Sequence, residues 1–422
     1  MEYAFVVFYI LLCFWIFPKI SFIKNAKLTD TEIRILLFIK LFSGIFCAWY
    51  FRKTFANGDH SSINEIGKIE YGYLVSDPKL FFSSLAIDIK SYGWGGVFES
   101  SYSFWANLRF NLLFKFVAIL NIISKGNFYF NSMIFSSLVF FGHISFFRVF
   151  RQMYPGYKYS LLAMCFFIPS VWLYTSCVHK DGFVFLAIAF SCFIFYSYLH
   201  NKDSIRIKHV LVFVLSIMMI FVFRNYIVVA ILPAMFIAIA CKTFPNKKRL
   251  LIPVVYSLFG LLFFLSGFLP GSLNLPAAVA NRRLDFAQLV EANTNMPMNN
   301  LTPDFSGFAI NLPQAINHSL FRPYLWEAFG SSVSLAALEL FFYQLVIIYF
   351  LFYGRKKNWL AYNFNIFGLA FFINMMLIIG YTIPNIGAIV RYRGVFWLFI
   401  ICPIWCSLSH YSTFERWLRK SS

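Results

Sequence analysis

GFVFLAIAFSCFIFYSYL, residues 182–199, is an apolar stretch without a single charged side chain. As a helix it would rise about 27 Å, close to the roughly 30 Å of hydrocarbon that a transmembrane helix must cross. The rest of the chain has the same character: of its 422 residues, 60% are hydrophobic, 13% are charged and 57 are Phe. This composition lies far outside that of soluble domains and predicts an all-α polytopic integral membrane protein.

Eleven apolar runs have about the length of a membrane span. A twelfth run, 104–123, is left out of this set because Asn107, Arg109, Asn111 and Lys115 interrupt its first half. We expect it to form an amphipathic helix on the outer surface of the membrane. The first run is short, but it lacks a basic segment before it and a small-residue cleavage site, so an uncleaved span is expected. The eleven runs are 4–17, 34–51, 127–147, 160–177, 182–199, 209–223, 226–241, 250–267, 332–352, 361–381 and 394–409.

Lys and Arg are distributed unevenly over the connections between these runs. Short basic loops stay in the cytoplasm, and they set the orientation of the chain. With the first run crossing inward, the inner segments hold 20 of the 36 Lys and Arg residues and a net charge of +16, against +3 outside. This predicts an outer N-terminus and a cytoplasmic C-terminus. The positive charge is therefore mainly a topology signal, and no nucleic-acid partner is expected.

We expect one membrane domain, 1–422, in the inner (cytoplasmic) membrane of a bacterium, since the composition fits an AT-rich bacterial genome. Two outer connections are long enough to fold: 52–126, which contains the surface helix, and 268–331. The second is rich in Pro, Asn and Ala, which indicates irregular structure with a short helix near 278–291. The eight cysteines lie within or at the ends of apolar runs, which argues against a disulfide framework and a zinc site.

Two acidic clusters fall on the predicted outer side. Asp59 lies in ANGDHSS (56–62), just beyond the second span, and Asp181 lies in the short connection His179-Lys180-Asp181. An aspartate at a membrane surface can act as a general base or a metal ligand, whereas Asn-Gly-Asp is also common in turns. Asp59, His60 and Asp181 are the candidate catalytic residues. The cofactor is left open, with a divalent cation as one option.

Basic residues lie at the same side. Lys180 is a candidate phosphate ligand, although it could also pair with Asp181 for topological reasons. Arg224 is costly so close to hydrocarbon unless it has an anionic partner or reaches water. Arg391 and Arg393 lie just before the last apolar run, and arginine is suited to bidentate phosphate contacts. These four residues are the candidate ligands of a lipid phosphate.

The second long connection supplies candidate substrate-binding residues. Arg282 and Arg283 lie near its expected helix, and Arg322 and Glu327 flank aromatic residues that could stack on sugar rings. Trp326 could equally belong to an interfacial aromatic belt. Inside the spans, Lys40, His143, Glu339 and Gln344 show no informative spacing and are interpreted as helix-packing groups.

Several of these motifs resemble bacterial membrane glycosyltransferases of the GT-C superfold. They are an acidic residue in the first long outer loop, a Pro169-Ser170-Val171-Trp172 stretch followed by Lys180-Asp181, and Asn-x-Gly-x-x-x-Arg-Tyr-Arg over residues 385–393. The resemblance implies a polyprenyl-phosphate sugar donor, a base role for Asp59 and a phosphate-binding role for Lys180, Arg391 and Arg393. The chain departs from that pattern in having two spans before the loop.

A sugar-transfer site on the outer face needs a lipid-carried donor, because nucleotide sugars are made in the cytoplasm. The predicted reaction is attack of an acceptor hydroxyl, deprotonated by Asp59, on the anomeric carbon, with lipid phosphate leaving. The outer arginines would stabilise the charge on that phosphate. The predicted partners are a polyprenyl-phosphate or polyprenyl-diphosphate glycan and membrane lipids.

Three alternatives remain open. An O-antigen polymerase resembles this chain in size, span number and outer arginines, and would join repeat units carried on polyprenyl diphosphate. A transporter of a lipid-linked anion would place its charges near the bilayer midplane. A purely structural membrane protein would tolerate substitution at all the polar clusters.

Overall fold

The computed structural model describes residues 2–55, 58–84, 96–98, 103–200, 205–288, 294–328, 333–354, 359 and 361–408. This part of the chain is helical and contains no strand, as expected for an all-α protein. The helices are α1 (Glu2–Ile16), η1 (Phe17–Lys19), α2 (Ser21–Lys24), α3 (Asp30–Thr54), α4 (Asp59–Ser76), α6 (Phe104–Ser124), α7 (Phe128–Met153), α8 (Lys158–Phe167), α9 (Pro169–Ser176), α10 (Lys180–His200), α11 (Ile207–Thr243), η3 (Pro245–Lys247), α12 (Lys248–Leu265), η4 (Ser266–Phe268), η5 (Gly271–Leu273), α13 (Leu275–Ala287), α14 (Phe305–Ile316), η6 (Asn317–Phe321), α15 (Leu325–Ala328), α16 (Ser334–Tyr353), α18 (Asn363–Thr382) and α19 (Ile386–Cys406).

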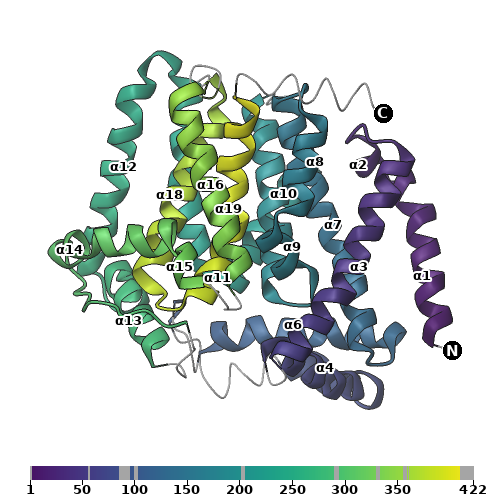
Figure 1. The fold of residues 1–422 in the computed structure, drawn as a ribbon. Helices are drawn as coiled ribbons and strands as arrows, with labels where there is room; N and C mark the ends of the chain where they lie inside the picture. Colours follow the sequence, from purple (N-terminus) through teal and green to yellow (C-terminus); the bar gives the residue numbers. More distant parts are fainter. Residues whose placement is uncertain are drawn as a thin grey trace.

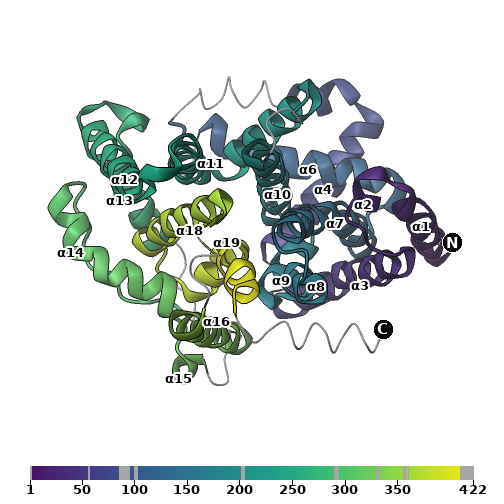
Figure 2. The same cartoon turned by 90° about the horizontal axis from the view of Figure 1, so that it is seen from above.

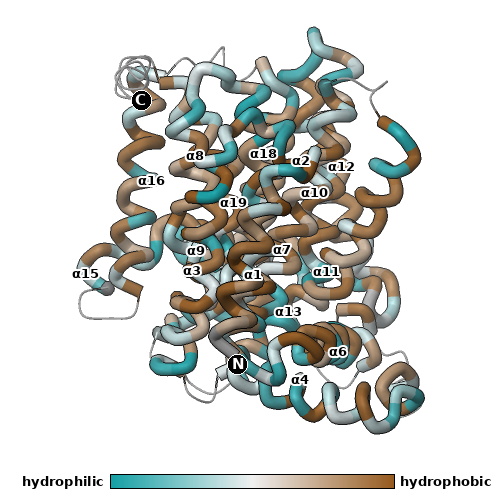
Figure 3. The backbone as a smooth tube through the Cα atoms, turned by 90° about the vertical axis from the view of Figure 1, so that its right-hand side faces the viewer, coloured by the Kyte–Doolittle hydropathy of each residue, from teal (hydrophilic) through white to brown (hydrophobic). Residues whose placement is uncertain are grey.

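Most of the long helices form one upright bundle whose middle is hydrophobic (Figures 1 and 3). Among the described residues, nine helices are long and apolar enough to cross a membrane, and the bent pair α8 and α9 makes a tenth candidate. The N-terminal helix α1 is also apolar but shorter. The multi-pass fold is therefore confirmed, and the candidate spans other than α6 fall on the expected apolar runs.

Helix α11 accounts for two of the expected runs, because its 37 residues bend sharply at Arg224. Arg224 has extended backbone angles (φ −152°, ψ 75°) and binds Asp181 at the start of α10. Near the other end of α11, Lys242 donates to the Tyr198 carbonyl at the end of α10, at 2.7 Å. The second half of α11 therefore runs back along the length of α10, as the separate runs 209–223 and 226–241 predicted.

Helix α6 was expected to lie on the surface, although it is long and apolar enough to be a candidate span. Figures 1 and 3 show it running across one end of the bundle, beside α4 and roughly perpendicular to the long helices. The side chain of Asn121 in α6 donates to the carbonyl of Gly67 in α4, at 3.2 Å. Helices α13 and α15 lie toward the same end, so both long connections contribute to one face (Figure 1).

Helices α7, α10, α18 and α19 meet in the middle of the bundle (Figure 2). Buried phenylalanine rings from these four helices fill the space between them. Phe399 of α19 packs edge-on against Phe146 of α7 and Phe371 of α18, with ring centroids 5.4 and 5.6 Å apart. Small residues allow the closest helix contacts. A Cβ atom on Gly44 of α3 would lie only 2.6 Å from the Ser132 carbonyl oxygen of α7. This tight packing fixes the ends of the helices that carry the polar clusters.

Candidate functional site

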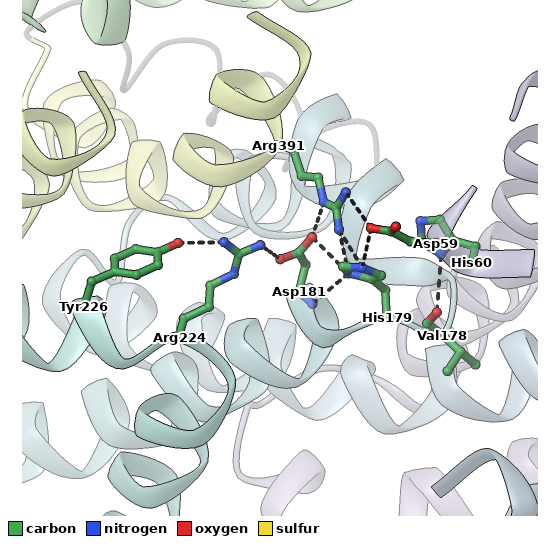
Figure 4. A network of polar contacts seen from close by, with 8 residues as sticks. All are labelled: Asp59, His60, Val178, His179, Asp181, Arg224, Tyr226 and Arg391. Carbon is green, nitrogen blue, oxygen red and sulfur yellow. Dashed lines mark hydrogen bonds and ion pairs between the residues drawn. The ribbon is translucent and has the colours of Figure 1, made fainter. Parts of the chain in front are cut away.

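Four of the predicted polar clusters meet at the end of the bundle covered by α4 and α6 (Figure 4). Asp181, in the first turn of α10, is the centre of this network and has a side chain only 10% exposed. Its Oδ1 accepts a hydrogen bond from Arg224, and its Oδ2 accepts one from Nε of Arg391. One buried carboxylate thus holds two guanidinium groups from α11 and α19. This is the anionic partner that the position of Arg224 required.

Arg224 is held on three sides at the bend of α11. Besides Asp181, its guanidinium donates to the Tyr226 hydroxyl at 2.6 Å and lies 3.7 Å from the centroid of the Tyr392 ring. Cation–π contact with a ring partly replaces the hydration that a buried guanidinium loses. Arg391 and Arg393 were placed before the final span, but α19 already begins at Ile386, so these residues lie within its first two turns.

His179 lies between the two acidic residues and is almost fully buried. Its Nδ1 is 3.1 Å from Oδ2 of Asp181, and its Nε2 is 3.7 Å from Oδ2 of Asp59. Nη2 of Arg391 lies 2.6 Å from the same Nε2 atom. Burial, reinforced by the charge of Arg391, lowers the pKa of His179 below its usual value. The imidazole is therefore neutral at pH 7, with its two nitrogens shared among these groups.

Asp59 occupies the first turn of α4, directly after Gly58, and its side chain is 61% exposed. Asn-Gly-Asp is also common in turns, but here Asp59 begins an 18-residue helix. The proximity of His179, 3.7 Å away, together with the nearby charge of Arg391, holds the pKa of Asp59 well below its usual range. Asp59 is thus an anion at neutral pH that faces solvent on one side and the network on the other.

His60 is turned away from solvent and packs behind His179. Its ring stacks on Phe51 of α3 at 4.1 Å between centroids, and its Nδ1 lies 3.3 Å from the Val178 carbonyl oxygen. Burial lowers the pKa of His60 well below its usual value. These contacts place His60 beneath the network, where it supports His179, while its predicted catalytic role stays a prediction.

A cavity of about 760 Å³ opens beside this network. Its walls are mostly apolar and come from α11, α12, α13, α14 and α18, with Phe259, Phe263 and Phe308 among them. Its polar lining includes four basic side chains, and no acidic side chain among the residues the structure describes. The basic residues are Arg109 of α6, Lys180 of α10, Arg224 of α11 and Arg282 of α13.

Basic side chains outnumber acidic ones among the described residues of the network and of the cavity lining. Arg224 and Arg391 are balanced by Asp181 and Asp59, and His179 is neutral. Lys180 lies 5.1 Å from the centroid of the Phe110 ring, and Arg282 lies 4.8 Å from that of Phe286. The cavity therefore combines a cationic end with long apolar walls, which suits an amphiphile that has an anionic head group.

Other predicted site residues face elsewhere. Arg393 donates to the carbonyl oxygens of Ser319 and Arg322, at 2.7 and 2.5 Å, on another side of α19 from Arg391. Arg283 donates to the Asn299 carbonyl and, at 3.0 Å, to Oε1 of Gln314. Arg393 therefore ties the second connection to α19, whereas Arg283 ties two segments of that connection together, and neither arginine lines the cavity.

The aromatic cluster near α15 is separate from the network. Arg322 and Glu327 form an ion pair of 3.0 Å. Tyr324 stacks on Trp326 with centroids 4.6 Å apart, and Trp326 is 72% exposed. This exposed stack fits both interpretations made from the sequence, a sugar platform and an interfacial belt.

Sequence reasoning missed three residues of the site. Arg109 was noted only as an interruption of an apolar run, although it lines the cavity. Tyr226 and Tyr392 were overlooked as partners of Arg224. The available signal was their spacing, because each tyrosine lies within two residues of a predicted phosphate-binding arginine.

No group of three or more His, Cys, Asp or Glu side chains that could hold a metal ion occurs in the described part of the chain. Comparisons with protein-family models, with curated proteins and with solved structures find no match. The site geometry and the membrane fold are therefore the basis for a functional proposal.

Proposed function

We propose that this protein is an integral-membrane glycosyltransferase that uses a polyprenyl-phosphate-linked sugar at the outer face of a bacterial cytoplasmic membrane. Cell-surface polysaccharide synthesis is the process in which such a donor would be used. The observation that carries the proposal is the cavity, whose four basic residues lie near one another and whose remaining walls are mostly apolar. A lipid phosphate matches both parts: its phosphate would bind the basic residues, and its isoprenoid tail would lie along the phenylalanines.

In this proposal the donor phosphate binds beside Lys180, Arg224 and Arg282, with Arg109 at the same end. The acceptor hydroxyl approaches from the exposed side of Asp59. A bond forms between the acceptor oxygen and the anomeric carbon, the bond from that carbon to the phosphate oxygen breaks, and the hydroxyl proton passes to Asp59. The basic residues stabilise the phosphate as it leaves with the bonding electrons.

The distance between base and phosphate constrains this mechanism. Asp59 does not line the cavity, and it connects to the cationic end through Arg391, Asp181 and Arg224. The donor sugar would therefore lie along this bridge, with its phosphate on the cavity side and its anomeric carbon toward Asp59. Asp181, which binds two guanidiniums, serves to position them and does not contact the substrate.

A repeat-unit polymerase is the second candidate, and one observation favours it. The lowered pKa of Asp59 makes this carboxylate a weak base, whereas the cavity is well supplied with cations. A mechanism that depends mainly on stabilising a leaving diphosphate would need the arginines more than the aspartate. The same cavity would then hold a diphosphate-linked oligosaccharide.

The test is the lipid-linked glycan profile of cells that lack the protein, complemented with wild type, Asp59→Asn or Arg391→Ala. Membrane expression of each variant is confirmed first. Asp59→Asn is expected to remove one sugar from every glycan if the protein is the transferase. Single unpolymerised repeat units, with Asp59→Asn active and Arg391→Ala inactive, would indicate the polymerase. An unchanged profile in the deletion strain would refute both enzymes and favour a transporter or a structural role.

A further inference from the structure

The span that precedes the site is broken. Helices α8 and α9 meet at an angle of 48°, at Ile168. Helix α9 has only eight residues, begins with Pro169 and has no capping hydrogen bond from the side chain of Ile168. Three residues after α9 ends, the chain reaches His179, Lys180 and Asp181 in succession. The placement of this short helix therefore determines where three residues of the candidate site lie.

A carboxylate from another helix caps the first turn of α9. Oε2 of Glu339, on α16, accepts a hydrogen bond from the Ser170 backbone nitrogen at 2.8 Å. Oε1 of Glu339 accepts from the Ser170 hydroxyl at 2.6 Å and from the Tyr343 hydroxyl at 2.7 Å. Gly394 lets α19 lie close to the same turn of α9, since a Cβ atom on Gly394 would lie 2.7 Å from the Ser170 hydroxyl oxygen.

An ammonium group from a third helix lies at the other end of α9. Lys40 of α3 is 2% exposed, and its Nζ donates to the Ser176 hydroxyl at 2.8 Å and to the Thr175 hydroxyl at 3.3 Å. The Thr175 hydroxyl in turn donates to the Val171 carbonyl at 2.7 Å. No carboxylate lies within ion-pair distance of Lys40 among the described residues.

The positions of the two groups match the dipole of the helix between them. A helix carries partial positive charge at its N-terminus and partial negative charge at its C-terminus, so an anion is stabilised at the first and a cation at the second. Glu339 and Lys40 occupy these two ends. Charged groups inside a membrane are costly and are retained where they have a specific partner. Here that partner is the short helix α9.

We propose that Glu339 and Lys40 are positioning residues that hold α9 by its two ends and thereby fix His179, Lys180 and Asp181 at the site. Both residues had been interpreted from the sequence as ordinary helix-packing groups. We call this pair of contacts the α9 clamp. The catalytic importance of the clamp rests on the function proposed above, whereas its existence does not depend on that function.

The clamp is tested by hydrogen–deuterium exchange of residues 169–179 in protein reconstituted into lipid nanodiscs without substrate. Glu339→Leu and Lys40→Met are each expected to raise amide exchange in this segment by about tenfold or more, because its local opening becomes easier. Lys40→Arg keeps the charge and is expected to stay close to wild type. A matched control is Lys115→Met, which removes another buried ammonium, paired with Glu70 at 3.2 Å.

A second readout follows His179 itself. Its carbethoxylation by diethyl pyrocarbonate, measured by mass spectrometry, should rise in Glu339→Leu and Lys40→Met while that of His318, buried in η6, stays constant. Unchanged exchange in 169–179, or an equal increase in α7 and α10, would overturn the proposal. If Lys40→Met fails to fold, Lys40→Gln replaces it. Because neither readout uses a substrate, they remain decisive even if the glycan assay refutes the proposed function.

Discussion

Replacing Asp181 with asparagine probes the network most sharply. The substitution keeps the size of the side chain and removes its charge. In the wild type the carboxylate binds Arg224 and Arg391, whose side chains are 7% and 19% exposed. The variant leaves two largely buried guanidiniums without their shared anion, and it also removes the negative charge beside Nδ1 of His179. We expect a large loss of stability, since an uncompensated buried charge is strongly unfavourable.

Removing one partner of a buried ion pair costs about 3 to 5 kcal/mol. The lower part of this range applies to Asp181→Asn, because Arg391 keeps a contact with Asp59 at 3.9 Å. A loss of about 3 kcal/mol changes the unfolding equilibrium roughly 150-fold. Glu70→Gln is the control, because that carboxylate is 15% exposed and, among the described residues, pairs with one cation, Lys115. Its loss should be clearly smaller.

The assay is reversible unfolding in mild detergent, followed by circular dichroism, in chloride and in inorganic phosphate at equal ionic strength. Phosphate is expected to restore part of the stability of Asp181→Asn and to affect the wild type less, because only in the variant do Arg224 and Arg391 lack the Asp181 carboxylate. If Asp181→Asn is as stable as the wild type in chloride, or loses no more than Glu70→Gln, the role assigned to Asp181 is wrong.

Two further predictions concern packing and pH. Gly394→Ala should destabilise the protein by about 1 to 3 kcal/mol through overpacking, because its Cβ would lie 2.7 Å from the Ser170 hydroxyl oxygen. Gly72→Ala in α4 has open space around it and should be neutral or slightly stabilising in the same thermal unfolding assay. Burial lowers the pKa of His179 in the folded state, so the unfolded chain binds more protons below about pH 6.5 and stability should fall as the pH drops. His179→Gln should flatten this dependence between pH 7.5 and 5, whereas an unchanged slope would contradict it.

Much of the fold could be predicted because hydrophobic length is a direct consequence of bilayer thickness. The two runs on either side of Arg224 were separable because an arginine interrupts them, and α6 was placed on the surface for a similar reason. The helix α4 was not predicted, since residues 59–76 are of mixed polarity. It forms where Gly67 lets its backbone approach α6: a Cβ there would lie 2.4 Å from a methyl carbon of Val117. Such a contact depends on tertiary packing and has no local signal.

The structure brings together polar clusters that the sequence placed on one side, but the sequence did not show which side chains of each cluster face each other. Arg391 and Arg393 were treated as equivalent because the last span was expected to begin at 394. In a helix that begins at Ile386, residues two positions apart point about 200° apart, so only one of them can face Asp181. Arg282 and Arg283 are neighbours on α13 and likewise point in different directions. Arg282 lines the cavity, whereas Arg283 binds Asn299 and Gln314. Helix boundaries, more than residue types, limited the prediction.

The most direct test of the central claim is lipid binding at the cavity. Binding of a polyprenyl monophosphate and of the uncharged polyprenol of equal length would be compared by native mass spectrometry of the purified protein, for wild type, Arg282→Gln and Arg283→Gln. Arg282 lines the cavity and Arg283 does not, so they form a matched pair. We expect the wild type to prefer the phosphate, and Arg282→Gln, but not Arg283→Gln, to weaken it about tenfold, the scale of one charged hydrogen bond. Equal binding of both lipids, or equal loss in both variants, would contradict the account.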